Sequence, residues 1–227
     1  HQQRYVVPAD AVVPLPEGVP AARAVLAANL ETAINACWDG APAVGDRVAV
    51  VGAGVLGSLV AWLCARIPGV ELELIDTDPG RARLAEALGL VHRLPDQARG
   101  DCDLVFHASG NPAGLVRALE LAGQDATVVE MSWYGSRSAN LPLGAAFHAR
   151  RLRLQSSQVG RLPPQRSPRW DYRRRMELAL ALLVDPRMDA LISGETDFTD
   201  LPALMQRLAD APAGALCERI RYDGPTP

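Results

Sequence analysis

The sequence contains no lysine, because all 23 of its basic residues are arginines. This absence excludes the phosphate-binding lysine of a P-loop, the Schiff base of pyridoxal enzymes and the ATP-binding lysine of protein kinases. It equally excludes short-chain dehydrogenases, which require a Tyr-x-x-x-Lys pair. Aromatic residues are also few, at 5% of the chain, and the net charge of -3 gives no cationic field.

Cysteines and long apolar runs are scarce. The four cysteines stand far apart, with no C-x-x-C pair and no neighbouring histidine, which excludes a zinc ribbon, a redox dithiol and a disulfide framework. No apolar run approaches the roughly 20 residues of a membrane helix, and the first residues do not resemble a signal peptide. We therefore expect a cytoplasmic protein that binds no membrane.

Nucleic acid is not an expected partner of a chain with this charge balance. The stretch Arg161–Arg175 is the one place that favours it, because its arginines alternate with Trp170 and Tyr172. We interpret this stretch as a solvated loop and helix face near a subunit interface.

With 227 residues and 48% apolar residues, the chain is long enough to bury a sizeable core. Between residues 47 and 155, short β-branched runs alternate with helical patterns. This alternation predicts a parallel sheet with right-handed crossovers, an α/β doubly wound domain. The expected strands are Arg47–Val51, Val70–Ile75, Leu90–Arg93, Leu104–His107, Ala126–Met131 and Leu152–Gln155, and the expected helices are Val55–Ile67, Pro79–Leu88 and Pro112–Leu121.

The two flanks of this region differ in pattern. The proline-rich segment Tyr5–Val19 has room for a short edge strand or two but for no helix, whereas Ala21–Trp38 has one apolar face at helical spacing. After the sheet we expect a helix at about Trp170–Val184, a strand-like start near Leu191, a helix at Leu201–Ala209 and a closing strand at Leu216–Tyr222. We accordingly divide the chain into residues 1–20, a central domain of residues 21–190, and residues 191–227.

The sharpest motif is a G-x-G-x-x-G sequence formed by Gly52, Gly54 and Gly57. It follows an expected strand and opens an expected helix, which is the context of a dinucleotide fingerprint. Gly52 would let the chain turn sharply, Gly54 would let the backbone approach a pyrophosphate, and Gly57 would let helix and strand pack closely. The alternative, that these are turn glycines only, is less favoured.

Asp76 ends the second strand about 20 residues after the fingerprint, where an acidic side chain accepts hydrogen bonds from a ribose. A carboxylate there repels a 2′-phosphate, which favours NAD over NADP. Arg81 and Arg83 argue the other way, because either can swing toward such a phosphate. Thr77 belongs to the same group, and we expect Asp78 to cap the next helix rather than contact a ligand.

Two later strand ends should border the same crevice, since ligands of open parallel sheets lie beyond the carboxyl ends of the strands. These ends are Ser109–Gly110–Asn111 and Ser132–Trp133–Tyr134–Gly135. Ser109 and Gly110 would make room for the adenosine ribose or the nicotinamide side, and Trp133 or Tyr134 could wall the nicotinamide or simply fill the rim. His107 lies in an apolar strand, and we interpret it as a core histidine with its hydrogen bonds satisfied.

Together these segments resemble the coenzyme-binding half of zinc-type medium-chain alcohol dehydrogenases. The resemblance is carried by Val12–Val19, by Glu31 to Cys37, by Val44–Arg47 ahead of the first strand, and by the fingerprint, Asp76 and the closing strand in family order. No single segment is specific, but their order is.

The resemblance implies a doubly wound Rossmann sheet with remnants of a GroES-like β domain at both ends, most of that front domain preceding His1. By resemblance, the residues in contact with the dinucleotide are Val55, Leu56, Asp76, Arg81, Ser132, Trp133 and Gln155. Zinc would bind only through the front domain, because the one ligand position of this half is occupied by Ala28, with Glu31 one turn later. The strand Leu152–Gln155 would lie near a two-fold sheet extension, giving a homodimer or homotetramer.

The resemblance therefore implies an NAD(H)-dependent oxidoreductase acting on a small alcohol or carbonyl substrate, with catalytic residues outside this sequence. Two alternatives stay open. One is a stand-alone module that binds or senses NAD(H) without catalysis. The other is a methyltransferase that uses a similar glycine-rich loop, which the family order of the segments disfavours.

Overall fold

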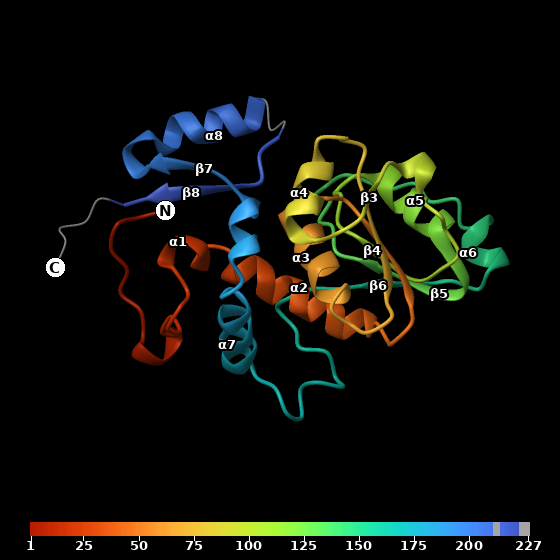
Figure 1. Ribbon diagram of the computed structural model, residues 1–227, viewed down its shortest axis with the longest axis horizontal. Helices are drawn as coiled ribbons and strands as arrows, with labels where there is room; N and C mark the ends of the chain where they lie inside the picture. Colours follow the sequence, from red (N-terminus) through yellow and green to blue (C-terminus); the bar gives the residue numbers. More distant parts are fainter. Residues whose placement is uncertain (211–213, 223–227) are drawn as a thin grey trace.

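The computed structural model describes residues 1–210 and 214–222, and it has two parts (Figure 1). A six-stranded sheet with its covering helices forms the larger part. A small two-stranded sheet with its own helix forms the other, and the N-terminal segment runs beside it. Helices α2 (Ala27–Gly40) and α7 (Tyr172–Leu182) lie between the two parts.

The large sheet has the strand order β3-β2-β1-β4-β5-β6, and every neighbouring pair is parallel. The doubly wound Rossmann sheet predicted from the alternating pattern is confirmed. The order reverses between β1 and β4, and this switch point opens a crevice at the carboxyl ends of those strands. The strands are β1 Arg47–Val51, β2 Glu71–Ile75, β3 His92–Arg93, β4 Cys102–His107, β5 Ala122–Glu130 and β6 Arg153–Ser156.

Helices cover both faces of this sheet. One face packs against α2, α3 (Val55–Cys64) and α4 (Arg81–Leu88), and the other packs against α5 (Pro112–Leu121) and the short α6 (Ala146–Ala149). Strands buried on both sides become almost continuously apolar, which explains the run Val48–Val51. Among the described helices, none has the length and apolar character needed to cross a membrane.

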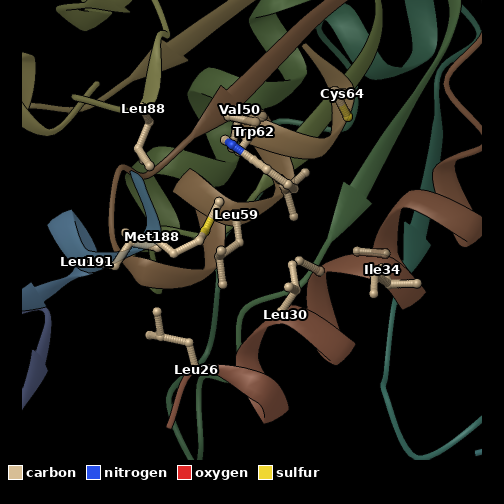
Figure 2. Close-up of a cluster of buried hydrophobic side chains, with 14 of the residues drawn as sticks. Leu26, Leu30, Ile34, Val50, Leu59, Trp62, Cys64, Leu88, Met188 and Leu191 are labelled. Atoms are coloured by element: carbon tan, nitrogen blue, oxygen red, sulfur yellow. The ribbon is translucent and has the colours of Figure 1, made fainter. Parts of the chain in front are cut away.

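The larger core joins α2 to α3 and to the chain after α7 (Figure 2). Leu26, Leu30 and Ile34 recur along α2 at helical spacing, and all three are buried. Leu26 and Leu30 lie toward Leu59 of α3, and Met188 from the 3-10 segment η3 (Pro186–Leu191) lies beside Leu59 in the same cluster. The long helix is therefore tied to the sheet from one side and to the C-terminal segments from the other.

The structure differs from the expected elements at the N-terminal flank. The helical pattern of Ala21–Trp38 is divided into α1 (Ala21–Ala24) and α2, because the chain tightens into a turn in which the Leu26 amide bonds to Arg23 O, three residues back. The segment before it holds a 3-10 turn, η1 (Ala9–Ala11), and no strand. Its prolines remove the amide donors that an edge strand needs.

The C-terminal region forms the small sheet. Strand β7 (Ile192–Asp197) pairs in parallel with β8 (Cys217–Arg221), and η4 (Phe198–Asp200) and α8 (Leu201–Asp210) connect them. The two ends of the described chain meet here, because His1 Nδ1 lies 2.8 Å from the Tyr222 hydroxyl. The helix and closing strand expected after Leu201 are confirmed within one residue at each end.

Candidate functional site

The glycine-rich loop between β1 and α3 is shaped by close backbone approaches. Gly52 has φ +109, and a Cβ there would lie 2.7 Å from the Ser109 amide nitrogen. A Cβ on Gly57 would lie 1.9 Å from the Gly52 carbonyl oxygen. Both positions therefore exclude a side chain on internal grounds alone.

Gly54 is different, because no heavy atom lies within 4 Å of where its Cβ would be. Its backbone is extended, with φ -76 and ψ -175, and it is the N-cap of α3. Alanine would fit there without strain. The fold itself does not require glycine at this position, and the open space lies beside a helix N-terminus whose first amides have no partner within the helix.

Asp76 follows the carboxyl end of β2 and holds the loop from the neighbouring strand. Its Oδ2 accepts a hydrogen bond from the Ala53 amide at 2.7 Å, and its Oδ1 accepts one from the Asp78 amide at 2.9 Å. Each carboxylate oxygen keeps a free lone pair, so the group can still accept hydroxyl donors.

The residues after Asp76 form the turn into α4. The expected helix cap at Asp78 is wrong, because α4 begins at Arg81 with Gly80 as its N-cap and no side-chain cap bond. The Asp78 carboxylate instead accepts a hydrogen bond from the Gly80 amide at 2.8 Å, within the turn before the helix. Arg81 lies 3.5 Å from Asp78 in an ion pair, and its side chain is mostly buried. Arg81 is therefore held locally by a carboxylate, which competes with any 2′-phosphate for its charge.

A cavity of about 590 Å³ connects these groups. Six of the residues predicted as cofactor contacts line it, namely Gly52, Gly54, Asp76, Thr77, Arg81 and Ser109. Val55, Leu56 and Gly57 stand at the adjoining start of α3, and Gly110 follows Ser109. The rest of the cavity wall comes chiefly from Pro95 and from α5, including Gly114, Val116 and Arg117. None of these four residues had been identified from the sequence.

A buried polar pair stands behind Ser109, one of the residues that line this cavity, where β4 and β5 end side by side. His107 and Glu130 are register partners, and His107 Nδ1 lies 2.9 and 2.8 Å from the two carboxylate oxygens. On its other side, His107 Nε2 lies 2.6 Å from Ser109 Oγ. His107 is fully buried with both ring nitrogens engaged, as interpreted from the sequence. Glu130 was missed, although a carboxylate near the end of an apolar strand is a usable signal.

Several donors converge on Glu130. The Ser132 amide donates to Oε1 at 2.6 Å, and the Tyr134 hydroxyl donates to Oε2 at 2.9 Å. Burial alone raises the pKa of Glu130, but the hydrogen bond and charge of His107, together with these two donors, outweigh it, and the pKa lies below its ordinary value. Burial and the neighbouring carboxylate raise the pKa of Tyr134, which keeps its hydroxyl a donor.

The next loop turns its two aromatic residues in opposite ways. Tyr134 points inward to Glu130, whereas Trp133 is 89% exposed and lines no part of the cavity. The Ser132 hydroxyl accepts a hydrogen bond from the Gly110 amide at 3.0 Å and so joins the two loops. Ser132 therefore contacts the loop that follows Ser109 without lining the cavity, and Trp133 lies outside the cavity.

Gln155 also lies away from the cavity. Its side-chain amide donates to the Asp39 carbonyl at 3.4 Å, on α2. The carboxylate of Asp39 accepts a hydrogen bond from Ser157 at 2.6 Å, while burial raises the pKa of Asp39. Strand β6, which carries Gln155, is exposed along its whole length at the edge of the sheet.

Glu31, one turn after the ligand position occupied by Ala28, is part of a buried ion pair. Glu31 Oε1 lies 2.9 Å from Nε of Arg175, whose side chain is 3% exposed. Arg175 also donates to Asn35 Oδ1 at 2.5 Å and to the Val159 carbonyl at 2.8 Å. Glu31 is therefore engaged by an arginine. Across residues 1–210 and 214–222, no three His, Cys, Asp or Glu side chains are grouped as metal ligands require.

The arginine-rich stretch is partly a packing element. Arg175 is buried, which corrects the interpretation of this whole stretch as solvated. Arg174 lies over the ring of Trp170 at 4.0 Å, and Trp170 packs on Trp38 with ring centroids 4.8 Å apart. The guanidinium of the exposed Arg174 thus stacks on a half-buried aromatic ring, so this part of the stretch also packs against the protein.

Comparisons with known proteins find dehydrogenases that share this fold or part of this sequence. No family model matches the chain. The L-threonine 3-dehydrogenase of Ruegeria pomeroyi is 28% identical over 125 residues, which are 55% of this chain and 36% of that protein. The solved L-idonate 5-dehydrogenase of Escherichia coli superposes with a TM-score of 0.76 at 22% identity, covering 92% of this chain and 59% of that one.

Two further solved structures contain a cofactor. An alcohol dehydrogenase of Escherichia coli complexed with NADH has a TM-score of 0.72 at 22% identity, covering 93% of this chain and 62% of that one. A putative zinc-binding dehydrogenase of Sinorhizobium meliloti bound to NADP has a TM-score of 0.72 at 19% identity, covering 92% and 61%. The resemblance to zinc-type medium-chain dehydrogenases is confirmed. The chain spans about a third of the curated relative and about three fifths of the solved structures.

Proposed function

We propose that this chain is the dinucleotide-binding part of an NAD(H)-dependent oxidoreductase of the alcohol or polyol dehydrogenase type. One observation carries the proposal. The glycine-rich loop, the N-terminus of α3 and the Asp76 carboxylate share one cavity at the switch point of a Rossmann sheet, and the glycine at Gly54 is not required by the fold.

The residues present fit such a cofactor. Amides at the start of α3 suit a pyrophosphate, because helix N-termini offer free donors and a positive dipole end. The free lone pairs of Asp76 suit the hydroxyls of a ribose. When bound, a nicotinamide cofactor exchanges a hydride with an alcohol or carbonyl carbon. The protein residues described above bind and orient the cofactor for that exchange.

The charge of the cavity supports NAD over NADP. A 2′-phosphate carries about -1.5 to -2 charges at neutral pH and would stand beside the Asp76 carboxylate, while Arg81 is already paired with Asp78. Because neighbours with NADH and with NADP both share this fold, the preference rests on these side chains alone.

Substrate, metal and assembly belong to the proposal as well. We propose a small alcohol or carbonyl substrate, and we derive no step through zinc, because the described residues do not fit a zinc site. We propose residues 1–20 and 191–227 as the parts of a GroES-like domain that join the Rossmann domain of residues 21–190. The exposed edge of β6 is the surface that we propose for homodimers.

The test is a titration of the chain with NADH and NADPH, followed by protein-to-NADH fluorescence transfer. We expect NADH to bind more tightly than NADPH, and Asp76→Asn to reduce that preference while weakening NADH. Equal binding of the two cofactors by both proteins would contradict the assignment of Asp76. Binding of S-adenosylmethionine in place of NADH would contradict the oxidoreductase proposal, and NADH binding by the whole protein without turnover would favour the sensing module.

A further inference from the structure

The pair His107–Glu130 is a buried titratable group that cofactor binding does not by itself require. His107 is fully buried, and the side chain of Glu130 is 14% exposed. Their strands end at the switch point, so the pair stands directly behind Ser109, which lines the cavity. The inference below rests on the proposed dinucleotide site.

Glu130 determines which ring nitrogen of His107 carries the proton. Its carboxylate is surrounded by the Ser132 amide and the Tyr134 hydroxyl, and it therefore accepts from His107 as well. In the neutral ring the proton then lies on Nδ1, and Nε2 is left with a lone pair.

Ser109 responds to that lone pair. Its hydroxyl donates to Nε2 at 2.6 Å, and its oxygen accepts a hydrogen bond from the Asn111 amide at 3.2 Å. A Cβ on Gly114 of α5 would lie 2.3 Å from this oxygen and 2.9 Å from Nε2, so glycine leaves the space that the bond occupies. The Asn111 carbonyl is a second acceptor for this hydroxyl, but it lies at 3.5 Å, against 2.6 Å for Nε2. With its one proton on the shorter bond to His107, Ser109 presents an acceptor to a ligand in the cavity.

We propose that the His107–Glu130 pair is a positioning device that fixes the direction of the Ser109 hydroxyl, so that Ser109 presents an acceptor to a ribose hydroxyl of the dinucleotide. Ribose hydroxyls are donors that match it, and phosphate oxygens are acceptors that do not. Protonation of His107 makes Nε2 a donor and frees the Ser109 proton, which removes the match. The titratable side chains next to the His107 ring are those of Glu130 and Tyr134. Among the described residues, the neighbouring elements contribute no charged group at this point, because α5 approaches the ring at Gly114 and β1 pairs with His107 at Val51.

The first test compares Ser109→Ala with Ser193→Ala in NADH titrations. Ser193 is a matched control in the small sheet, since its hydroxyl also donates to a side chain, Glu218 at 2.8 Å, and accepts from a backbone amide, Leu216 at 3.0 Å. We expect Ser109→Ala to weaken NADH about 3- to 10-fold and the control to leave it unchanged. ADP identifies the ribose: an equal loss for ADP assigns the adenosine ribose, and no loss assigns the nicotinamide ribose.

The second test uses Glu130→Gln, whose amide can donate to Nδ1 and so moves the ring proton to Nε2. We expect this variant to weaken NADH by a similar factor and to remove the additional effect of Ser109→Ala in the double variant.

Unchanged NADH affinity in Ser109→Ala, or full additivity with Glu130→Gln, would overturn the positioning role while leaving the proposed function intact. Failure of the wild-type chain to bind NADH at all would instead overturn the proposed function. Thermal unfolding of each variant separates lost stability from lost affinity, because a purely structural role would lower the unfolding temperature without coupling the two substitutions.

Discussion

Replacing Gly54 by alanine separates the needs of the ligand from the needs of the fold. The backbone there, φ -76 and ψ -175, is open to alanine, and nothing lies within 4 Å of the new methyl group. Alanine is a poorer N-cap than glycine but lowers the entropy of the unfolded chain, and these two effects offset, so stability should change by less than about 1 kcal/mol.

The effect on the cofactor should be much larger. A methyl group at the start of α3 keeps a phosphate away from the helix amides, and each charge-assisted hydrogen bond contributes about 1.5–3 kcal/mol. Losing one such bond weakens binding about 10- to 100-fold.

The assay is an NADH titration paired with thermal unfolding, with Gly144→Ala as the control. Gly144 likewise has no atom within 4 Å of its would-be Cβ and lines no part of the cavity. Native NADH affinity in Gly54→Ala would refute the assignment of the loop to a pyrophosphate. An unfolding temperature that drops sharply would refute the claim that the fold tolerates alanine here.

Three other substitutions test how residues in and around the site contribute to the stability of the fold. In Gly57→Ala the new Cβ would lie 1.9 Å from the Gly52 carbonyl oxygen, and the free energy of unfolding measured in denaturant should fall by about 1–3 kcal/mol. Unchanged stability would contradict the close approach of helix α3 to the glycine-rich loop. Arg175→Met leaves the Glu31 carboxylate buried without its partner and should lower the free energy of unfolding by about 3–5 kcal/mol. The double variant with Glu31→Met should recover much of this loss, and no recovery would exclude the ion pair as the cause. Because folding lowers the pKa of Glu130, the ionised carboxylate stabilises the protein above pH 4.5, and this stabilisation is lost as the pH falls through the lowered pKa. Glu130→Gln should therefore flatten the acid side of the curve of stability against pH, and an unchanged curve would contradict this role of Glu130.

Most of the large sheet was predictable because its signals are local. Apolar β-branched runs such as Arg47–Val51 and the spacing of Gly52, Gly54 and Gly57 are read from neighbouring residues. Right-handed crossovers and short connections limit the possible strand orders, and the structure supplies the one that is adopted. The break between α1 and α2 was not predicted, because Val25 and Leu26 keep the apolar spacing of a helix while the backbone tightens into a turn.

In the candidate site, too, the prediction that rested on local spacing agrees with the structure, and others do not. Asp76 was identified because it ends a strand at a known distance from the glycines, and the structure places it in the same cavity. Gln155 was assigned by resemblance alone, and the structure directs its side chain to Asp39. Trp133 was assigned from its place after a strand end and by resemblance, and the structure leaves it exposed outside the cavity.

The sequence by itself determined the sheet, the glycine-rich turn and the acidic residue beside it, since each depends on local spacing and on backbone geometry. Only the tertiary structure decided which distant side chains meet. Glu130 reaches His107 through the register of β4 and β5, and Arg175 reaches Glu31 across 144 residues through the packing of α7 on α2. Such pairs follow from how strands align and helices pack, and no pattern within one segment specifies them.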